Sequence, residues 1–320
     1  MIAQPTQKRR LKGASFLDSA GMIIVFVALF IYLSLTVKYF FTWDNMVGLA
    51  LSVSMVGMVA CTMLFCLASG DFDLSIEAVV AFSGVFAAVM INRTGSVPLG
   101  IFAGVLAGGL VGVVNGVVIA KLRINALITT LATLQIVRGL GFIVSDGKAV
   151  GVTKPEFFVL GNSTFAGIPA PVWITLVCFI TFDIVLHRTR FGRNTLAIGG
   201  NKEASRLAGI PVARVKIAIF TLQGLMAGLA GVVLASRMTS GQPNTSVGFS
   251  LDVISACVLG GVSLTGGVGT MIGAVVGVLI MGTVQNAMNL KNVAPFYQYV
   301  ARGIILLAAV LFDQWRHRRK

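Results

Sequence analysis

Charged residues are scarce in this chain. Only 11% of its 320 residues are Asp, Glu, Lys or Arg, against about 25% in an average soluble domain, whereas 56% are hydrophobic. The net charge is +14, but a nucleic-acid-binding protein would gather its basic residues on one exposed patch, and here they stand between apolar runs. The composition therefore excludes an ordinary water-soluble domain and gives no support to nucleic acid as a partner.

Motifs for catalysis and metal binding are also missing. The cysteines lie inside apolar segments, with no Cys-x-x-Cys pair and no neighbouring His, which is typical of buried free thiols: Cys61, Cys66, Cys178 and Cys257. The nearest approach to a phosphate-binding loop, Gly147-Lys148, lacks the upstream Gly and the following hydroxyl. No Gly-x-Ser-x-Gly elbow is present. We predict no enzyme activity, no metal and no cofactor for this chain.

Long apolar runs are abundant instead. A helix needs about 20 apolar residues to cross a bilayer. Eight runs are clear, and two weaker ones, 124–144 with several polar residues and the short 249–264, raise the number to ten; the clear runs are 21–37, 46–68, 74–91, 98–120, 171–186, 217–235, 271–288 and 297–312. We expect an all-α integral membrane protein with about ten transmembrane helices, eight being the alternative. Either number is even, so both termini lie on one side.

The basic residues predict which side that is. Most of the 25 Lys and Arg residues fall in segments that a ten-span arrangement places together: 1–20, 121–123, 188–216 and 313–320. Lys and Arg concentrate in cytoplasmic loops. We therefore expect a multi-pass domain over residues 21–312, two basic cytoplasmic tails, 1–20 and 313–320, and a cytoplasmic loop over 188–216. Trp43, Trp173 and Trp315 stand at predicted span ends, where indole rings favour the headgroup layer.

Glycine spacing predicts close helix packing. Four glycines recur every four residues in the fourth run, and two other runs repeat the spacing: Gly104, Gly108, Gly112 and Gly116, then Gly224 with Gly228 and Gly273 with Gly277. Small residues at this spacing lie on one face of a helix and let a second backbone approach. We expect these glycines to serve packing and not chemistry.

An internal repeat is visible as well. The stretch from Phe72 to Gly84 resembles the stretch from Phe249 to Gly261, with the same spacing between Phe and Gly, and Arg138-Gly139 resembles Arg302-Gly303. Spans two to five would then repeat as spans seven to ten, and an offset of five spans inverts one half relative to the other. Transporters often contain inverted repeats, with the substrate path at their interface.

The basic loop is expected to contain a short surface helix. Residues 202–208 favour a helix, Asn201 suits its start, Gly209 suits its end and Pro211 prevents continuation. A transporter driven by a separate ATPase needs a rigid protruding element of this kind to fit a groove in its motor. The alternative is an ordinary basic loop.

Several motifs resemble one family. Glu203-Ala204-Ser205 followed by Gly209 resembles the coupling motif of bacterial binding-protein-dependent permeases, Glu-Ala-Ala with Gly four residues later, although Ser205 replaces the second Ala. The surrounding 199–209, together with 73–75, 125–133 and 259–267, is similar to the monosaccharide branch of these permeases, which includes ribose, xylose, galactose and arabinose systems. Within it, 66–75, 144–151 and 235–243 most resemble permeases of L-arabinose systems. Phe72 departs from the branch, where Ile is common.

This resemblance implies a type II importer-like fold of the ATP-binding cassette (ABC) class in a bacterial inner membrane, with both termini cytoplasmic. It implies a permease homodimer surrounded by membrane lipid, two cytoplasmic ABC ATPase subunits that bind ATP and Mg²⁺, and a periplasmic sugar-binding protein that delivers a monosaccharide, L-arabinose. The residues that the resemblance assigns to the ATPase-coupling loop are Asn201, Glu203, Ala204, Ser205, Gly209 and Pro211.

A neutral sugar needs hydrogen-bonding groups along its path. Polar residues inside spans are costly in lipid, so they usually face a cavity or another helix. The candidates are Asp71, Asp73, Asn115, Thr129, Thr133, Gln135 and Asn286. For Asp73 the stronger interpretation is a cap on a helix beginning at Leu74.

Two other functional classes stay open. An ion-coupled secondary transporter of a small polar solute is compatible with an inverted repeat, but that class usually has an ionisable residue buried near mid-membrane, and no persuasive one is present. A membrane-embedded enzyme or a passive channel comes last. Dependence of uptake on an ATPase, on an ion gradient or on neither distinguishes these classes.

Overall fold

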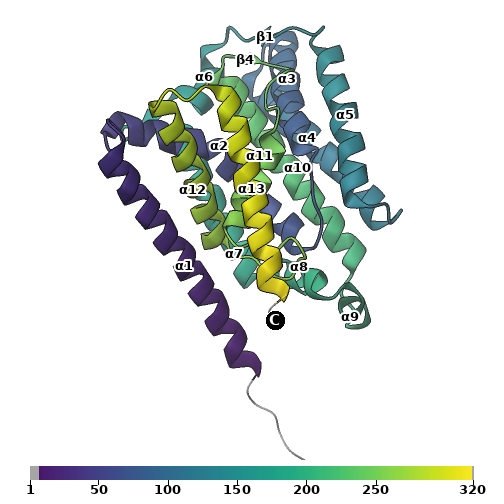
Figure 1. Cartoon of the computed structure of the whole chain (residues 1–320). Helices are drawn as coiled ribbons and strands as arrows, with labels where there is room; N and C mark the ends of the chain where they lie inside the picture. The colour runs from purple at the N-terminus through teal and green to yellow at the C-terminus, as the bar shows by residue number, and fades with distance from the viewer. Residues whose placement is uncertain (1–6, 319–320) are drawn as a thin grey trace, which may run out of the picture.

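The fold is mostly helical in a computed structural model, which describes the backbone of residues 7–318 and the side chains of residues 21–311 and 314 (Figure 1). The long helices are α1 (Gln7–Thr36), α2 (Trp43–Ala68), α3 (Ile76–Thr94), α4 (Val97–Ala120), α5 (Ala126–Val144), α7 (Ala170–Arg188), α10 (Val212–Arg237), α12 (Met271–Leu290) and α13 (Pro295–Arg318). The shorter ones are α6 (Pro155–Asn162), α8 (Arg190–Gly200), α9 (Lys202–Leu207) and α11 (Phe249–Leu259). The side chains of the predicted tails, 1–20 and 313–320, lie outside the described residues, apart from Gln314.

The strands in the described part of the chain are short. β1 (Val150–Gly151) pairs antiparallel with β4 (Ser240–Gly241), and β2 (Thr164–Phe165) pairs antiparallel with β3 (Ile168–Pro169). β1, β4 and α6 lie at one end of the bundle, while α8, α9 and the C-terminal end of α13 lie at the other, which we name the α9 end (Figure 1). The start of α1 points to the α9 end too (Figure 1).

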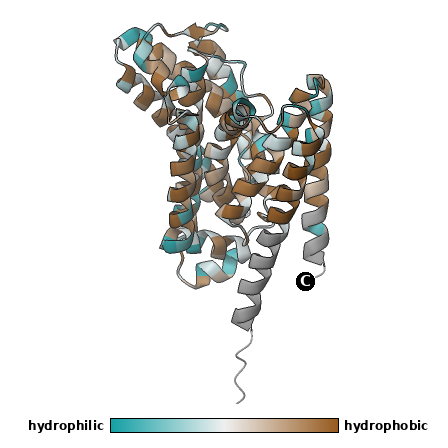
Figure 2. Ribbon diagram, turned by 90° about the vertical axis from the view of Figure 1, so that its left-hand side faces the viewer, coloured by the Kyte–Doolittle hydropathy of each residue, from teal (hydrophilic) through white to brown (hydrophobic). Residues whose placement is uncertain are grey.

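Seven of the described helices are long and apolar enough to cross a membrane: α2, α3, α4, α5, α7, α10 and α12. Three shorter apolar helical stretches accompany them, Gly21–Thr36, Phe249–Leu259 and Pro295–Leu311. The run 249–264 is not one continuous helix, because α11 ends at Leu259 and Gly261 takes a positive φ of 79°. Hydrophobic residues dominate the sides of the bundle and hydrophilic ones gather toward its two ends (Figure 2).

α10 packs face to face with α4 along the predicted glycine seam. A Cβ atom on Gly108 would stand 2.9 Å from the Cα of Gly228, and one on Gly116 would stand 2.8 Å from the Cα of Ile217. The second seam also forms, since Gly277 faces Ala256 of α11 and Gly273 faces Gly260, the residue directly after α11. The packing role expected of these glycines is confirmed.

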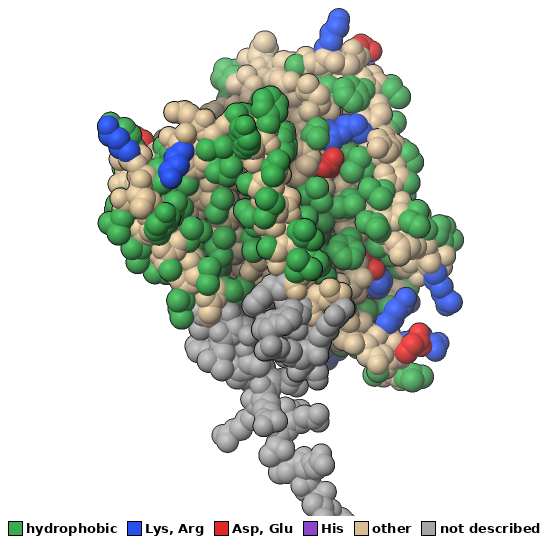
Figure 3. Space-filling view, viewed as in Figure 1, with side chains coloured by type: hydrophobic (Ala, Val, Ile, Leu, Met, Phe, Trp, Pro, Cys, Tyr) green, Lys and Arg blue, Asp and Glu red, His purple; other side chains and the backbone are tan. Residues whose placement is uncertain are grey.

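The outer face of the bundle is apolar. Hydrophobic side chains cover the middle of the face that Figure 3 presents, and Lys and Arg side chains lie mostly toward its ends (Figure 3). α5 and α13 expose a series of large apolar side chains, among them Ile128, Ile136, Ile143, Val300 and Ile304. Such a surface suits lipid or a second membrane-embedded chain.

α2 and α3 are joined by a chain segment that is extended and buried. Residues 71–74 adopt no regular structure, and Asp71, Asp73 and Ser75 are each less than a tenth exposed. Gly70 begins the segment with φ of 80°, a left-handed conformation that favours glycine. We name residues 69–75 the extended segment; it carries two of the predicted site residues.

Candidate functional site

α9 protrudes at the α9 end as the short surface helix predicted from the loop. The Oδ1 atom of Asn201 accepts from the backbone N–H of Ala204 at 2.9 Å, which caps the first turn. Gly209 takes φ of 81° after the last turn, and α10 starts directly after Pro211. The boundaries of the predicted helix are therefore confirmed to within one residue.

The surface of α9 is exposed on most sides. Glu203 and Arg206 form an exposed ion pair at 3.0 Å, while Ala204 is exposed and Ser205 is buried against the bundle. Leu207 is 82% exposed. An apolar side chain this open at the tip of a protruding helix has no cover within the described chain, which suits contact with a partner.

Three of the predicted path residues form one chain of hydrogen bonds. The Thr133 hydroxyl donates to Oδ1 of Asn115 at 2.6 Å, and Nδ2 of Asn115 donates to the Ser75 hydroxyl at 2.9 Å. The Ser75 hydroxyl in turn donates to Oδ1 of Asp73 at 2.6 Å. This polar chain, Thr133–Asn115–Ser75–Asp73, connects α5, α4 and the start of α3 through the apolar interior.

Asp73 also takes part in starting α3. Its Oδ1 atom accepts from the backbone N–H of Ser75 at 2.9 Å, and Ser75 is the N-cap residue of α3. The helix begins at Ile76, two residues later than expected from Leu74. Since Asp73 is 1% exposed, it does not face an open cavity in this conformation.

The remaining predicted path residues lie apart from the polar chain. Asp71 forms an ion pair with Lys216 of α10 at 2.6 Å. The Thr129 hydroxyl bonds to the backbone of its own helix at Asn125, and Gln135 is exposed on the outside of α5. Asn286 exchanges two hydrogen bonds with Asn45 of α2, at 2.8 and 3.0 Å.

Sequence reasoning missed several interior polar residues. The Arg138 guanidinium bonds to Oε1 of Glu77 at 3.2 Å and to the carbonyl of Thr245 at 2.8 Å. Glu77 accepts further bonds from the backbone N–H of Gly248 and from the Ser250 hydroxyl, both at 3.0 Å. Arg138 thus joins α3, α5 and the chain before α11. Its position inside an apolar run was the one feature of the sequence that indicated an interior role.

Two other buried polar residues, Lys216 and Gln223, were not among the predicted site residues. Lys216 was counted among loop residues, yet it lies within α10 and is 7% exposed. Gln223, two turns further along α10, is fully buried, and neither atom of its amide has a hydrogen-bond partner among the described residues. In the part of the chain that the structure describes, no group of three or more His, Cys, Asp or Glu side chains could hold a metal ion.

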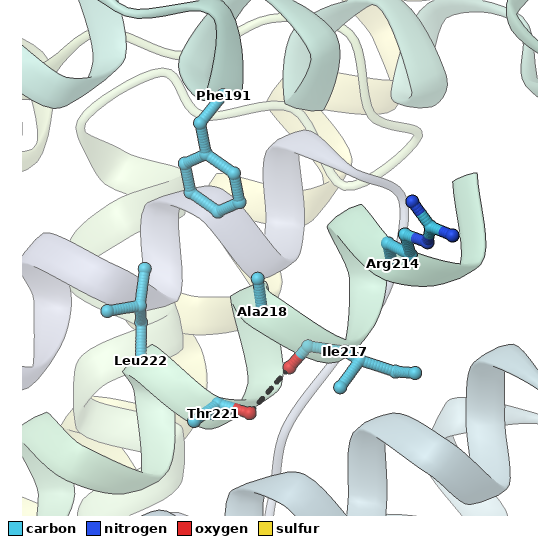
Figure 4. A pocket seen from close by; sticks show the side chains of 6 residues that line it. All are labelled: Phe191, Arg214, Ile217, Ala218, Thr221 and Leu222. Atoms are coloured by element: carbon cyan, nitrogen blue, oxygen red, sulfur yellow. Dashed lines mark hydrogen bonds between the residues drawn. The ribbon is translucent and has the colours of Figure 1, made fainter. Parts of the chain in front are cut away.

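A groove of about 440 Å³ opens between α8 and α10 (Figure 4). Its lining is almost wholly apolar, with Phe191, Ile217 and Leu222 around it, and the Thr221 hydroxyl bonds to the carbonyl of Ile217 (Figure 4). The groove contains none of the predicted path residues. The groove and the polar chain are therefore separate features of the bundle.

Comparison with known proteins identifies the family. Residues 45–310 match the model described as the permease component of branched-chain amino acid transport systems. The chain is 63% identical to the L-arabinose transport system permease protein AraH of Escherichia coli (strain K12), over 95% of this chain and 92% of that protein. It is 58% identical to the L-arabinose ABC transporter permease protein AraH of Azospirillum brasilense, over 95% and 90%.

A more distant relative is the ribose import permease protein RbsC of Bacillus subtilis (strain 168), 40% identical over 97% of both chains. No solved structure matches significantly. A family model that spans most of the chain, and relatives that match along nearly its whole length, lead to one conclusion: this chain belongs to the family of permease components of branched-chain amino acid and related transport systems.

Proposed function

We propose that this chain is the membrane-spanning permease subunit of an ATP-driven importer that carries L-arabinose across the bacterial inner membrane. The observation that carries the proposal is the 63% identity to an L-arabinose permease over 95% of the chain. The chain transports and does not catalyse, and ATP and Mg²⁺ bind to the partner ATPase. L-Arabinose follows from relatives alone, since no residue of the polar chain selects one sugar by itself.

The proposal includes ten spans in two inverted repeats, with both termini cytoplasmic. Seven long helices and three shorter apolar stretches supply ten candidate segments. The repeat gains support from Arg138 and Arg302, which matched in sequence: Arg138 pairs with Glu77 of α3, and Arg302 pairs with Asp252 of α11 at 3.0 Å. Non-helical chain also precedes both α3 and α11.

The two ends of the bundle are the proposed docking sites of the two soluble partners, the ATPase and the sugar-binding protein. We propose that the α9 end is cytoplasmic and that α9 enters a groove of the ABC ATPase, with Leu207 as the apolar contact and Asn201, Glu203, Ala204, Ser205, Gly209 and Pro211 shaping the helix. The periplasmic sugar-binding protein would dock at the opposite end, near β1 and β4. A second copy of the chain completes the path, and lipid covers the rest.

Reconstitution tests the function. Liposomes would contain the chain with its ATPase and sugar-binding protein, and uptake of labelled L-arabinose would be compared with uptake of D-ribose and D-xylose. We expect L-arabinose uptake that requires ATP and every component. Uptake driven by a proton or sodium gradient without the ATPase would overturn the proposal in favour of an ion-coupled secondary transporter.

Leu207→Asp tests the docking of α9. Because the exposed leucine would be replaced by a charge, we expect the ATPase to dissociate from the permease and uptake to fall at least about tenfold. Co-purification of the tagged ATPase with the permease measures the loss. Leu122→Asp, which makes the same change at an exposed leucine outside α9, is the matched control. Equal loss of the ATPase in both variants would contradict a contact made by Leu207.

We propose that the polar chain lies along the sugar path, and Asn115→Leu tests this role. The change keeps the shape of the side chain but removes the acceptor of Thr133 and the donor to Ser75. The half-buried Thr133 hydroxyl would lose its acceptor, and the buried Ser75 hydroxyl would lose a donor but keep its bond to Asp73. A buried polar group that loses its partner costs about 1–3 kcal/mol, and we expect initial uptake to fall several-fold while the ATPase stays bound. Thr221→Val, whose hydroxyl bonds only within its own helix, is the control. Unchanged uptake in Asn115→Leu would exclude the polar chain from the path.

A further inference from the structure

Asp71 and Lys216 form a salt bridge in the interior of the bundle, where removing two charged groups from water costs free energy. Nζ of Lys216 lies 2.6 Å from Oδ2 of Asp71, and the side chains are 9% and 10% exposed. The Ser69 hydroxyl lies 3.5 Å from the same carboxylate oxygen. Replacing a buried ion pair by apolar side chains of similar volume is often neutral or stabilising. Stability alone is therefore a poor reason for this pair, and its position is the informative feature.

The pair joins α10 to the extended segment. Lys216 is the fifth residue of α10, the helix that follows α9 across the short link 208–211. Asp71 lies at the start of the irregular stretch of the extended segment. A displacement of α9 that moves the first turns of α10 therefore moves Lys216, and with it the carboxylate of Asp71. The backbone N–H of Asp71 still bonds to the Cys66 carbonyl at the end of α2, at 3.0 Å, but residues 72–74 after it adopt no regular structure.

A second contact ties the other flank of α9 to the same segment. Gly199, near the end of α8, packs on the Ala68 carbonyl, and a Cβ there would also stand 2.5 Å from the backbone nitrogen of Gly267. The N–H of Gly267 donates to the Ala68 carbonyl at 2.9 Å. A Cβ on Gly266 would stand 3.0 Å from the nitrogen of Gly70. The residues on both sides of α9 thus contact the junction between α2 and the extended segment, Lys216 at Asp71 and Gly199 at Ala68.

The extended segment ends in the polar chain. Asp73 follows Asp71 by two residues, and Asp73 and Ser75 form one end of the polar chain. A shift at Asp71 is therefore carried along a few residues of backbone to the side chains that bond Asn115 and Thr133. The contacts form a continuous physical connection between α9 and the polar chain. Whether movement is transmitted along this connection is tested by measuring the coupling between its two ends.

We propose that the Lys216–Asp71 ion pair is the link that carries the displacement of α9 to the extended segment and so couples ATP hydrolysis to movement of the polar chain. The inference rests on the proposed docking of an ATPase on α9. It also changes the role of Asp71, which was predicted to contact sugar: its carboxylate holds Lys216. Both residues are positioning residues and neither touches the transported molecule.

The test compares import with hydrolysis in the same vesicles. The complete complex of permease, ATPase and sugar-binding protein would be reconstituted with the double variant Lys216→Met/Asp71→Asn, which removes both charges and keeps the volume. We expect L-arabinose imported per ATP hydrolysed to fall about tenfold while hydrolysis continues. Lys216→Arg, which keeps the charge, should retain most of that ratio, and Lys121→Met, an exposed cytoplasmic-side lysine, should not change it.

A second measurement does not depend on import. Hydrogen–deuterium exchange of peptides covering residues 69–75 would be compared between the nucleotide-free complex and the complex trapped with ATP and vanadate. We expect exchange to change on trapping in the unaltered complex and not in the double variant. The same change in both, or import and hydrolysis that fall in proportion, would overturn the link. Failure of the unaltered complex to import would instead count against the proposed function.

Discussion

Replacing Arg138 by methionine is expected to lower the stability of the permease more than any other single change in its polar interior. The Glu77 carboxyl, whose side chain is 11% exposed, would lose its ionic partner, and the Thr245 carbonyl would lose a donor. Removing one partner of a buried pair costs about 3–5 kcal/mol. We expect a drop of at least about 10 °C in the unfolding midpoint of detergent-solubilised protein, followed by fluorescence-detected size exclusion after heating.

The double variant Arg138→Met/Glu77→Gln separates charge from packing. The glutamine amide introduced by Glu77→Gln would keep an oxygen for the N–H of Gly248 and the Ser250 hydroxyl, and no charge would remain without a partner. The midpoint should then recover by more than half of the loss seen in Arg138→Met. If the double variant is as unstable as the two single changes added together, the two side chains are not coupled and the explanation fails.

Gly224→Leu is expected to prevent folding of the membrane bundle. A Cβ at Gly224 would collide with the Gly108 carbonyl and would stand 2.9 Å from the nitrogen of Gly112. The obstacles are backbone atoms of α4, which cannot rotate away as a side chain does, so the two helices would have to separate and lose the contact that small residues permit. We expect little or no monodisperse protein after extraction from the membrane.

The control for Gly224→Leu is Gly48→Leu in α2. A Cβ at Gly48 meets nothing within 4 Å. The two substitutions add the same side chain to a helical glycine, so the change in helix propensity is equal and only the crossing differs. Similar yields of folded protein from both variants would contradict the close approach of α4 and α10.

Much of the fold follows from local sequence patterns. The apolar runs predicted the long helices, because the length needed to cross a bilayer is fixed by its thickness. The cap at Asn201, the stop at Gly209 and the block at Pro211 predicted α9 to within one residue, because each acts on its own turn of chain. The glycine spacing predicted which face of α4 would pack, although not that α10 would be the partner.

The site was less predictable because it depends on contacts between distant residues. Asp71 and Lys216 stand far apart in sequence, and nothing near either one shows that they pair. Lys216 looked like a loop residue because basic residues surround it, yet α10 begins before it. Ser75 was overlooked because a single serine is common, whereas its position between Asn115 and Asp73 makes it the centre of the polar chain.

The short length of α11 has a consequence for how the chain enters the membrane. Its 11 residues span about 16 Å, roughly half of the hydrocarbon layer. Such a segment has too little apolar length to leave the insertion channel by itself, and it carries Asp252, whose partner Arg302 belongs to α13. We expect α11 to stay associated with the channel during synthesis until α13 has emerged, so that the last three helices enter the lipid as one unit.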